Sequence, residues 1–73
     1  MKLTINGAEE TLNENHLSVA RLLEIRKVES PDMVTVELNG SFLDRKNFAT
    51  TMVRDGDQVE FLYFMGGGSR HAL

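Results

Sequence analysis

The stretch from Asp55 to Gly68 constrains this 73-residue chain most, because it joins a turn, a long strand and a glycine run. Asp55-Gly56-Asp57 is typical of a turn, since glycine accepts positive φ and aspartate can bond its own backbone. The next residues alternate in a period of two, which predicts a strand with one buried face formed by Val59, Phe61 and Tyr63. The run Gly66-Gly67-Gly68 then forms a narrow segment with maximal backbone freedom.

The glycine run has two interpretations on these residues alone. Glycine- and serine-rich ends usually behave as flexible linkers or frayed termini. A narrow, extended segment can also be threaded into a channel of another protein. The apolar strand that leads directly into the glycines favours this second, functional interpretation.

The size and charge of the chain exclude several classes of protein. Seventy-three residues are enough for one small domain with one core. The net charge of −3 argues against general nucleic-acid affinity, which needs clustered lysine and arginine. No apolar run approaches the roughly 20 residues of a membrane span, and the N-terminal residues turn polar too early for a signal peptide. We therefore expect a cytoplasmic protein that binds neither nucleic acid nor membrane.

The chain has no cysteine, so it has neither a disulfide nor a thiolate. His16 and His71 are the only imidazoles, and a metal site is therefore not expected. If the protein handles sulfur, a group other than a side-chain thiol must hold it.

The remaining residues predict one helix and several short strands. Asn6-Gly7 is the strongest hairpin signal, and Asn39-Gly40 repeats it. Ser18 is a good N-cap for a helix whose apolar residues follow helical spacing, and Pro31 limits how far that helix extends. The expected elements are strands at 2–6 and 9–12, a helix from 18 to about 27–29, strands at 33–38 and 41–43, a helical turn at 45–47 closed by an inward Phe48, and strands at 50–53 and 58–64.

This order predicts an α+β fold of the ubiquitin-like β-grasp class. The first and last strands are both apolar and a single helix is available, so we expect a mixed sheet of four to five strands wrapped on that helix. The first and last strands then lie parallel and adjacent, joined by a long crossover. Residues 1–65 form the domain, and residues 66–73 form a flexible C-terminal tail.

The last strand has a second face, on which Leu62 and Phe64 lie. If the helix covers Val59 and Phe61, these two side chains face solvent and form, with Met65, a docking surface for a partner. In the alternative interpretation a neighbouring segment covers them. Both remain open from the sequence.

Five segments carry a resemblance to a known family: Leu3–Gly7, Val36–Gly40, Arg45–Phe48, Asp55–Glu60 and Phe64–Gly68. Each is a weak signal alone, but their joint order and their short spacing to the glycines are specific. Over residues 1 to 68 the chain resembles the ThiS-type sulfur carriers of thiamine biosynthesis.

The resemblance implies a carrier that is acted on by enzymes and is not itself an enzyme. In the family, an E1-like adenylating enzyme uses ATP to activate the terminal glycine carboxylate. Sulfur then replaces the adenylate, and the resulting thiocarboxylate supplies thiazole synthase. Carried over to this chain, Gly68 reacts and Gly66 and Gly67 form the threading segment. No bound cofactor is implied, because ATP is used by the activating partner.

This chain departs from the family pattern because Ser69-Arg70-His71-Ala72-Leu73 follows the glycines. Gly68 therefore has no free carboxylate. Some members of the family carry removable residues, so the resemblance implies cleavage after Gly68 by a JAMM-type protease. A carrier that has lost the chemistry is the other interpretation.

Several alternative functions share this fold or this tail. The sulfur could serve cysteine or methionine formation, or molybdopterin synthesis, although the last group usually has a proline before the glycines. Gly68 could instead form an isopeptide bond, as in a ubiquitin-like protein modifier. A binding module of the TGS kind would give the tail no role.

Overall fold

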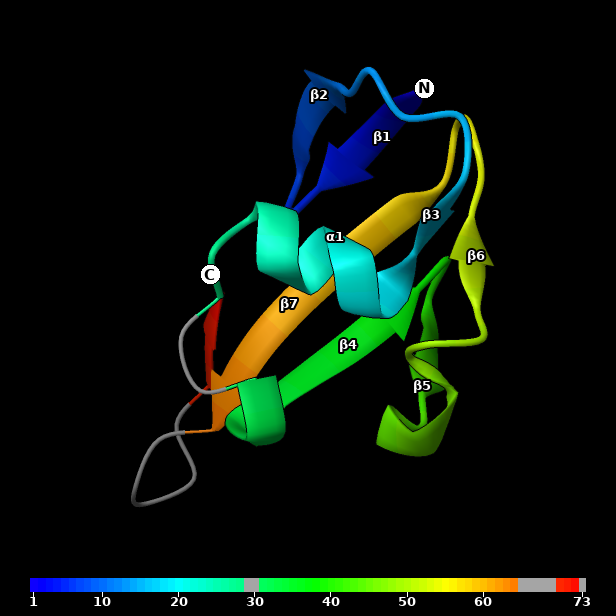
Figure 1. Ribbon diagram of the computed structural model, residues 1–73. Coiled ribbons are helices and arrows are strands. Elements are labelled where there is room, and N and C mark those ends of the chain that lie inside the picture. The colour runs from blue at the N-terminus through cyan, green and yellow to red at the C-terminus, as the bar shows by residue number, and fades with distance from the viewer. Residues whose placement is uncertain (29–30, 65–69, 73) are drawn as a thin grey trace.

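The computed structural model describes residues 1–28, 31–64 and 70–72, and shows a β-sheet with one α-helix lying across its face (Figure 1). The helix is α1 (Val19–Ile25), and two short 3₁₀ helices are η1 (Pro31–Met33) and η2 (Arg45–Asn47). The strands are β1 (Lys2–Ile5), β2 (Ala8–Thr11), β3 (Leu17–Ser18), β4 (Val34–Leu38), β5 (Ser41–Leu43), β6 (Met52–Val53), β7 (Gln58–Phe64) and β8 (Arg70–Ala72).

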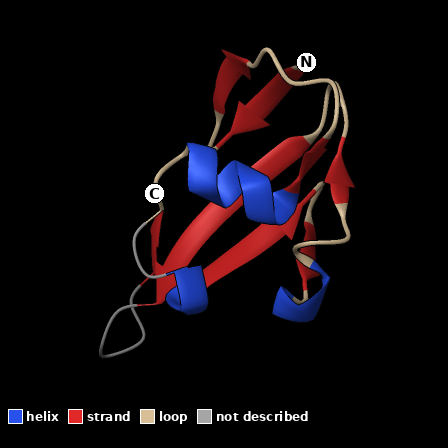
Figure 2. Ribbon diagram, viewed as in Figure 1, coloured by secondary structure: helices blue, strands red, loops and turns tan. Residues whose placement is uncertain are grey.

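The main sheet has the strand order β2-β1-β7-β4-β5, and β8 pairs with β7 beside this path. Strands β1 and β7 are parallel, whereas β4 pairs antiparallel with both β7 and β5. Strands β3 and β6 form a separate antiparallel pair. Figure 2 shows the resulting layers, with the helix on one side of the strands. The arrangement confirms the predicted β-grasp fold, including the parallel first and last long strands.

Both predicted hairpins form at their Asn-Gly turns. Asn6 and Gly7 have φ of +50° and +84°, and Asn39 and Gly40 have φ of +51° and +86°. Two consecutive residues with positive φ make the two-residue turn whose twist matches that of the flanking strands. Ile5 therefore faces Ala8, and Leu38 faces Ser41, at the closed ends of the two hairpins.

Helix α1 begins where the sequence predicts and ends earlier. The Ser18 Oγ accepts a hydrogen bond from the Arg21 N–H at 3.1 Å, which confirms the cap. The helix was expected to continue to residues 27–29, but Lys27 adopts a left-handed φ of +55°. The N–H groups of Lys27 and Val28 donate to the carbonyls of Glu24 and Leu23, at 3.0 and 3.1 Å. This pair of bonds is a Schellman ending, which stops the helix before Pro31 has any influence.

A single apolar core fills the space between the helix and the sheet. Phe48 is 7% exposed and Val59 and Phe61 are at most 1% exposed, which confirms their predicted inward positions. Among the described residues no buried side chain is polar or charged. The core comprises Leu3, Ile5, Leu17, Val19, Leu22, Leu23, Val34, Val36, Phe48, Val53, Val59 and Phe61.

No helix among the described residues is both long and apolar enough to cross a membrane.

Candidate functional site

Strand β7 leads directly to the predicted functional tail. It is the central strand of the sheet, with β1 along one edge and β4 along the other (Figure 1). Met65 and Gly66–Gly68 lie outside the described residues, so their predicted roles remain predictions. What the structure describes is the strand that carries them and the way in which that strand is held.

The turn before β7 is fixed by its aspartates, as the Asp-Gly-Asp motif suggests. The Asp57 carboxylate accepts hydrogen bonds from the Arg54 N–H at 2.8 Å and from the Asn39 side-chain amide at 3.1 Å. Asp55 accepts a bond from the Lys2 N–H at 2.6 Å, and Gly56 has a φ of +89°. These contacts tie the start of β7 to both neighbouring parts of the sheet.

Two asparagine side chains extend this support along β7. The Asn39 Oδ1 accepts from the Gln58 N–H, and the Asn6 Oδ1 accepts from the Phe61 N–H, each at 2.9 Å. The sequence predicted the two turns but missed these bonds. Each asparagine therefore both forms a hairpin turn and satisfies a backbone donor of β7.

The two edges of β7 are covered differently. Strand β4 pairs with β7 from Val59 to Tyr63. Strand β1 reaches only Gln58 and Val59 before it turns away at Asn6-Gly7. Because β4 occupies one edge, β8 must lie on the edge that β7 shares with β1, where it pairs with Leu62 to Phe64.

The burial of Leu62 bears on a question that the sequence left open. Its side chain lies on the face opposite Phe61 and is only 7% exposed. Its neighbours across the strands are Thr35 of β4 and Ala72 of β8. In this conformation Leu62 is covered, as the alternative interpretation allowed. The side chains of Phe64 and Met65 lie outside the described residues, so their predicted docking role remains a prediction.

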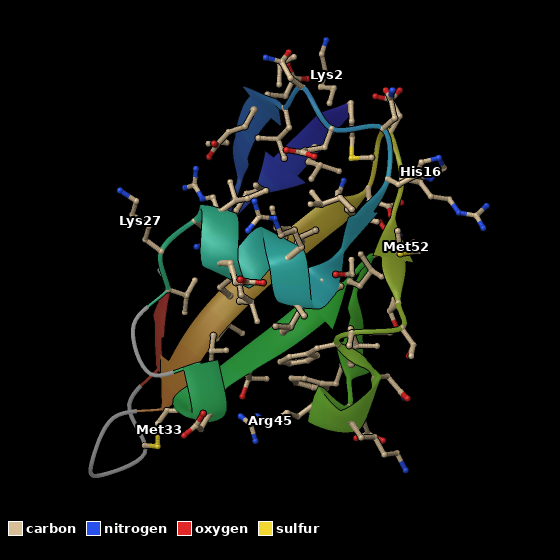
Figure 3. All side chains as sticks on the ribbon, in the orientation of Figure 1. Lys2, His16, Lys27, Met33, Arg45 and Met52 are labelled. Atoms are coloured by element: carbon tan, nitrogen blue, oxygen red, sulfur yellow. The ribbon has the colours of Figure 1, made fainter. Side chains whose placement is uncertain are left out.

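His16 and Arg45 have ordinary structural positions. Figure 3 shows His16 pointing outward from the loop that precedes β3, and it is exposed. Arg45 donates from its guanidinium to the Val34 carbonyl at 3.1 Å, so it ties η2 to β4. The part of the chain that the structure describes contains no group of three or more metal-ligating side chains placed to hold an ion.

A comparison with protein families matches residues 3–68 to the ThiS family model. The chain belongs to the ThiS family. Members of the ThiS family are small sulfur carrier proteins. The predicted resemblance is therefore confirmed.

Solved structures agree with this family assignment. The crystal structure of the thiamine biosynthesis protein ThiS from Geobacter metallireducens is 54% identical, with a TM-score of 0.86 over 93% of this chain and 100% of that one. The solution structure of a thiamine biosynthesis protein from the same organism is 53% identical, with a TM-score of 0.79 over 94% and 90% of the two chains.

A longer relative also matches this ThiS-family chain. It is a protein named thiazole synthase from Paramagnetospirillum magneticum, 39% identical over 72 residues, which make up 99% of this chain. The chain spans only 22% of the length of that relative.

Proposed function

We propose that this protein carries sulfur as a thiocarboxylate on Gly68 and donates it to thiazole formation in thiamine biosynthesis. The observation that carries the proposal is the family match over residues 3–68, which stops at the last glycine of the run. The similarity to thiamine biosynthesis proteins and to part of a thiazole synthase supports the pathway.

The chemistry explains why a bare main-chain end suits this task. A carboxylate is a poor electrophile, so an E1-like enzyme joins the Gly68 carboxylate to the AMP moiety of ATP and releases pyrophosphate. A sulfur nucleophile then attacks the acyl carbon and AMP leaves, which yields the thiocarboxylate. The chain has no cysteine that could hold sulfur instead, and glycine has no side chain to obstruct the attack.

The reaction requires that Gly68 become a chain end. Because Ser69 follows Gly68, the carbonyl carbon of Gly68 is held in an amide bond to the Ser69 nitrogen. We assign removal of residues 69–73 to a JAMM-type protease, which hydrolyses the bond between Gly68 and Ser69. Thiazole synthase is the favoured acceptor of the sulfur. Cysteine, methionine or molybdopterin synthesis would use the same carrier chemistry with another acceptor.

Activation of the trimmed protein tests this proposal. A chain that ends at Gly68 should support ATP–pyrophosphate exchange by the E1-like enzyme, and Gly68→Ala in the same chain should abolish it. The variant should melt at an unchanged temperature, because Gly68 lies in the chain beyond Phe64, the last residue of β7. An unchanged exchange rate in Gly68→Ala would contradict the assigned role of this residue.

A further inference from the structure

Along one edge, β7 pairs first with β1 and then with β8. The Asn6 N–H donates to the Val59 carbonyl, and the Asn6 Oδ1 accepts from the Phe61 N–H, each at 2.9 Å. In a strand, the backbone N–H and C=O groups of successive residues point alternately to the two edges. The odd-numbered residues of β7 therefore direct these groups to the edge that faces β1. The next such residue is Tyr63, which β1 does not reach because it turns away at Gly7.

Strand β8 covers this remaining part of the edge. His71 lies opposite Tyr63, and Ala72 lies opposite Leu62. Leu62, the β7 residue in register with Ala72, is itself buried. Without β8, the backbone groups of Tyr63 on this edge would have no strand to pair with, and an open edge of that kind attracts other strands.

We propose that the β7 edge at Leu62–Phe64 is a docking edge for an extended segment of the adenylating enzyme, and that β8 masks it until cleavage. The inference rests on the proposed function, since it assumes that residues 69–73 are removed. The uncut chain, in which these residues are still attached, is then self-blocked, and the trimmed chain offers the edge together with Leu62.

Cleavage releases β8 because its short pairing with β7 cannot hold it once the covalent connection is cut. β8 has three residues and, in the described structure, pairs with β7 alone. While attached, it competes as an intramolecular partner at high effective concentration. Once cut, its few hydrogen bonds no longer offset the entropy of ordering a separate peptide.

The pairing of β8 with β7 indicates which direction and which residues the partner segment needs. The segment runs antiparallel to β7 and adds a strand to the sheet, a common mode of peptide recognition. It needs a backbone N–H opposite Tyr63, which excludes proline there. Opposite Leu62, the position that Ala72 takes in the uncut chain, it needs an uncharged residue, because Leu62 is buried.

Two variants of the uncut chain test the masking. His71→Pro removes the backbone donor opposite Tyr63, whereas the control His71→Ala keeps it. We expect the Tyr63 amide to exchange with solvent about tenfold faster in His71→Pro and to be unchanged in His71→Ala. The Phe61 amide, held by Asn6, serves as an internal reference and should stay protected in both. Equal Tyr63 exchange in all three proteins would overturn the masking.

Binding to the purified E1-like enzyme without ATP tests the docking edge. We expect His71→Pro to bind about tenfold more tightly than His71→Ala. Equal affinities would overturn the inference, even if the chain ending at Gly68 is still adenylated. Self-association of His71→Pro into dimers without tighter enzyme binding would also overturn it. Because neither variant has a free Gly68 carboxylate, this result does not depend on the activation chemistry.

Discussion

Asn6 and Asn39 combine two functions that are usually separate. Each adopts a positive φ, which asparagine tolerates better than most residues other than glycine. Each also directs its side-chain oxygen to a backbone N–H of β7. The turn could be predicted from the Asn-Gly pairs. The bond from Phe61 to Asn6 could not, because 55 positions separate the two residues and only the fold brings them together.

Substitution of Asn6 should separate these two contributions. Asn6→Gly keeps the backbone freedom and loses the bond to Phe61, so we expect a loss of about 1–3 kcal/mol in the free energy of unfolding. Asn6→Ala should cost about 1–2 kcal/mol more, because alanine is strained at positive φ. Urea denaturation measures both values. The control Asn15→Gly, in an exposed loop, should change little. A fully stable Asn6→Gly would contradict the role of the side chain.

For helix α1, the first residue was easier to predict from the sequence than the last. The start of α1 is encoded by a local cap at Ser18. Its end depends on Val28 packing against the core after a left-handed Lys27, and no glycine signals this turn in the sequence. Strand β3 has two residues and β8 has three, too few for a periodic pattern. Both form because an edge of another strand is available.

The cap of α1 offers a test at the scale of elements. Ser18→Ala removes the acceptor of the Arg21 N–H and should lower the free energy of unfolding by about 0.5–2 kcal/mol. Ser18→Asp keeps an acceptor at the same position and should retain most of the stability. Thermal denaturation followed by circular dichroism compares the two variants. Equal stability of both would argue against the cap.

At the scale of the whole molecule, stability depends on one small core to which distant segments contribute. Phe48 follows η2 and packs against the cluster that α1 shares with the sheet, and its carbonyl accepts from the Ala20 N–H at 2.9 Å. The sequence identified this inward aromatic residue. It could not identify the burial of Leu62, because the strand that flanks Leu62 on one side, β8, was not predicted.

Two phenylalanines provide a matched test of the core. Phe48 is 7% exposed, whereas Phe42 on the edge strand β5 is 68% exposed. Phe48→Ala should cost about 3–5 kcal/mol, a large fraction of the stability of a small domain. Phe42→Ala should change the free energy of unfolding by about 0.5 kcal/mol or less. Similar losses in both variants would contradict the assignment of Phe48 to the core.

The candidate site itself was predicted from a pattern of glycines and a family resemblance and not from side-chain chemistry. This follows from the proposed mechanism, in which a main-chain carboxylate reacts and other enzymes supply the catalytic groups. Sequence motifs could therefore indicate Gly68, but side-chain geometry has little to add at such a site.

In the proposed function, Gly68 becomes a chain end and carries sulfur. Intact-mass spectrometry of the protein purified from its own cells, grown under thiamine demand, tests this most directly. We expect a chain that ends at Gly68 and a fraction whose mass is increased by one exchange of oxygen for sulfur. A protein that always retains Leu73 while it still delivers sulfur would show that Gly68 is not the carrier end.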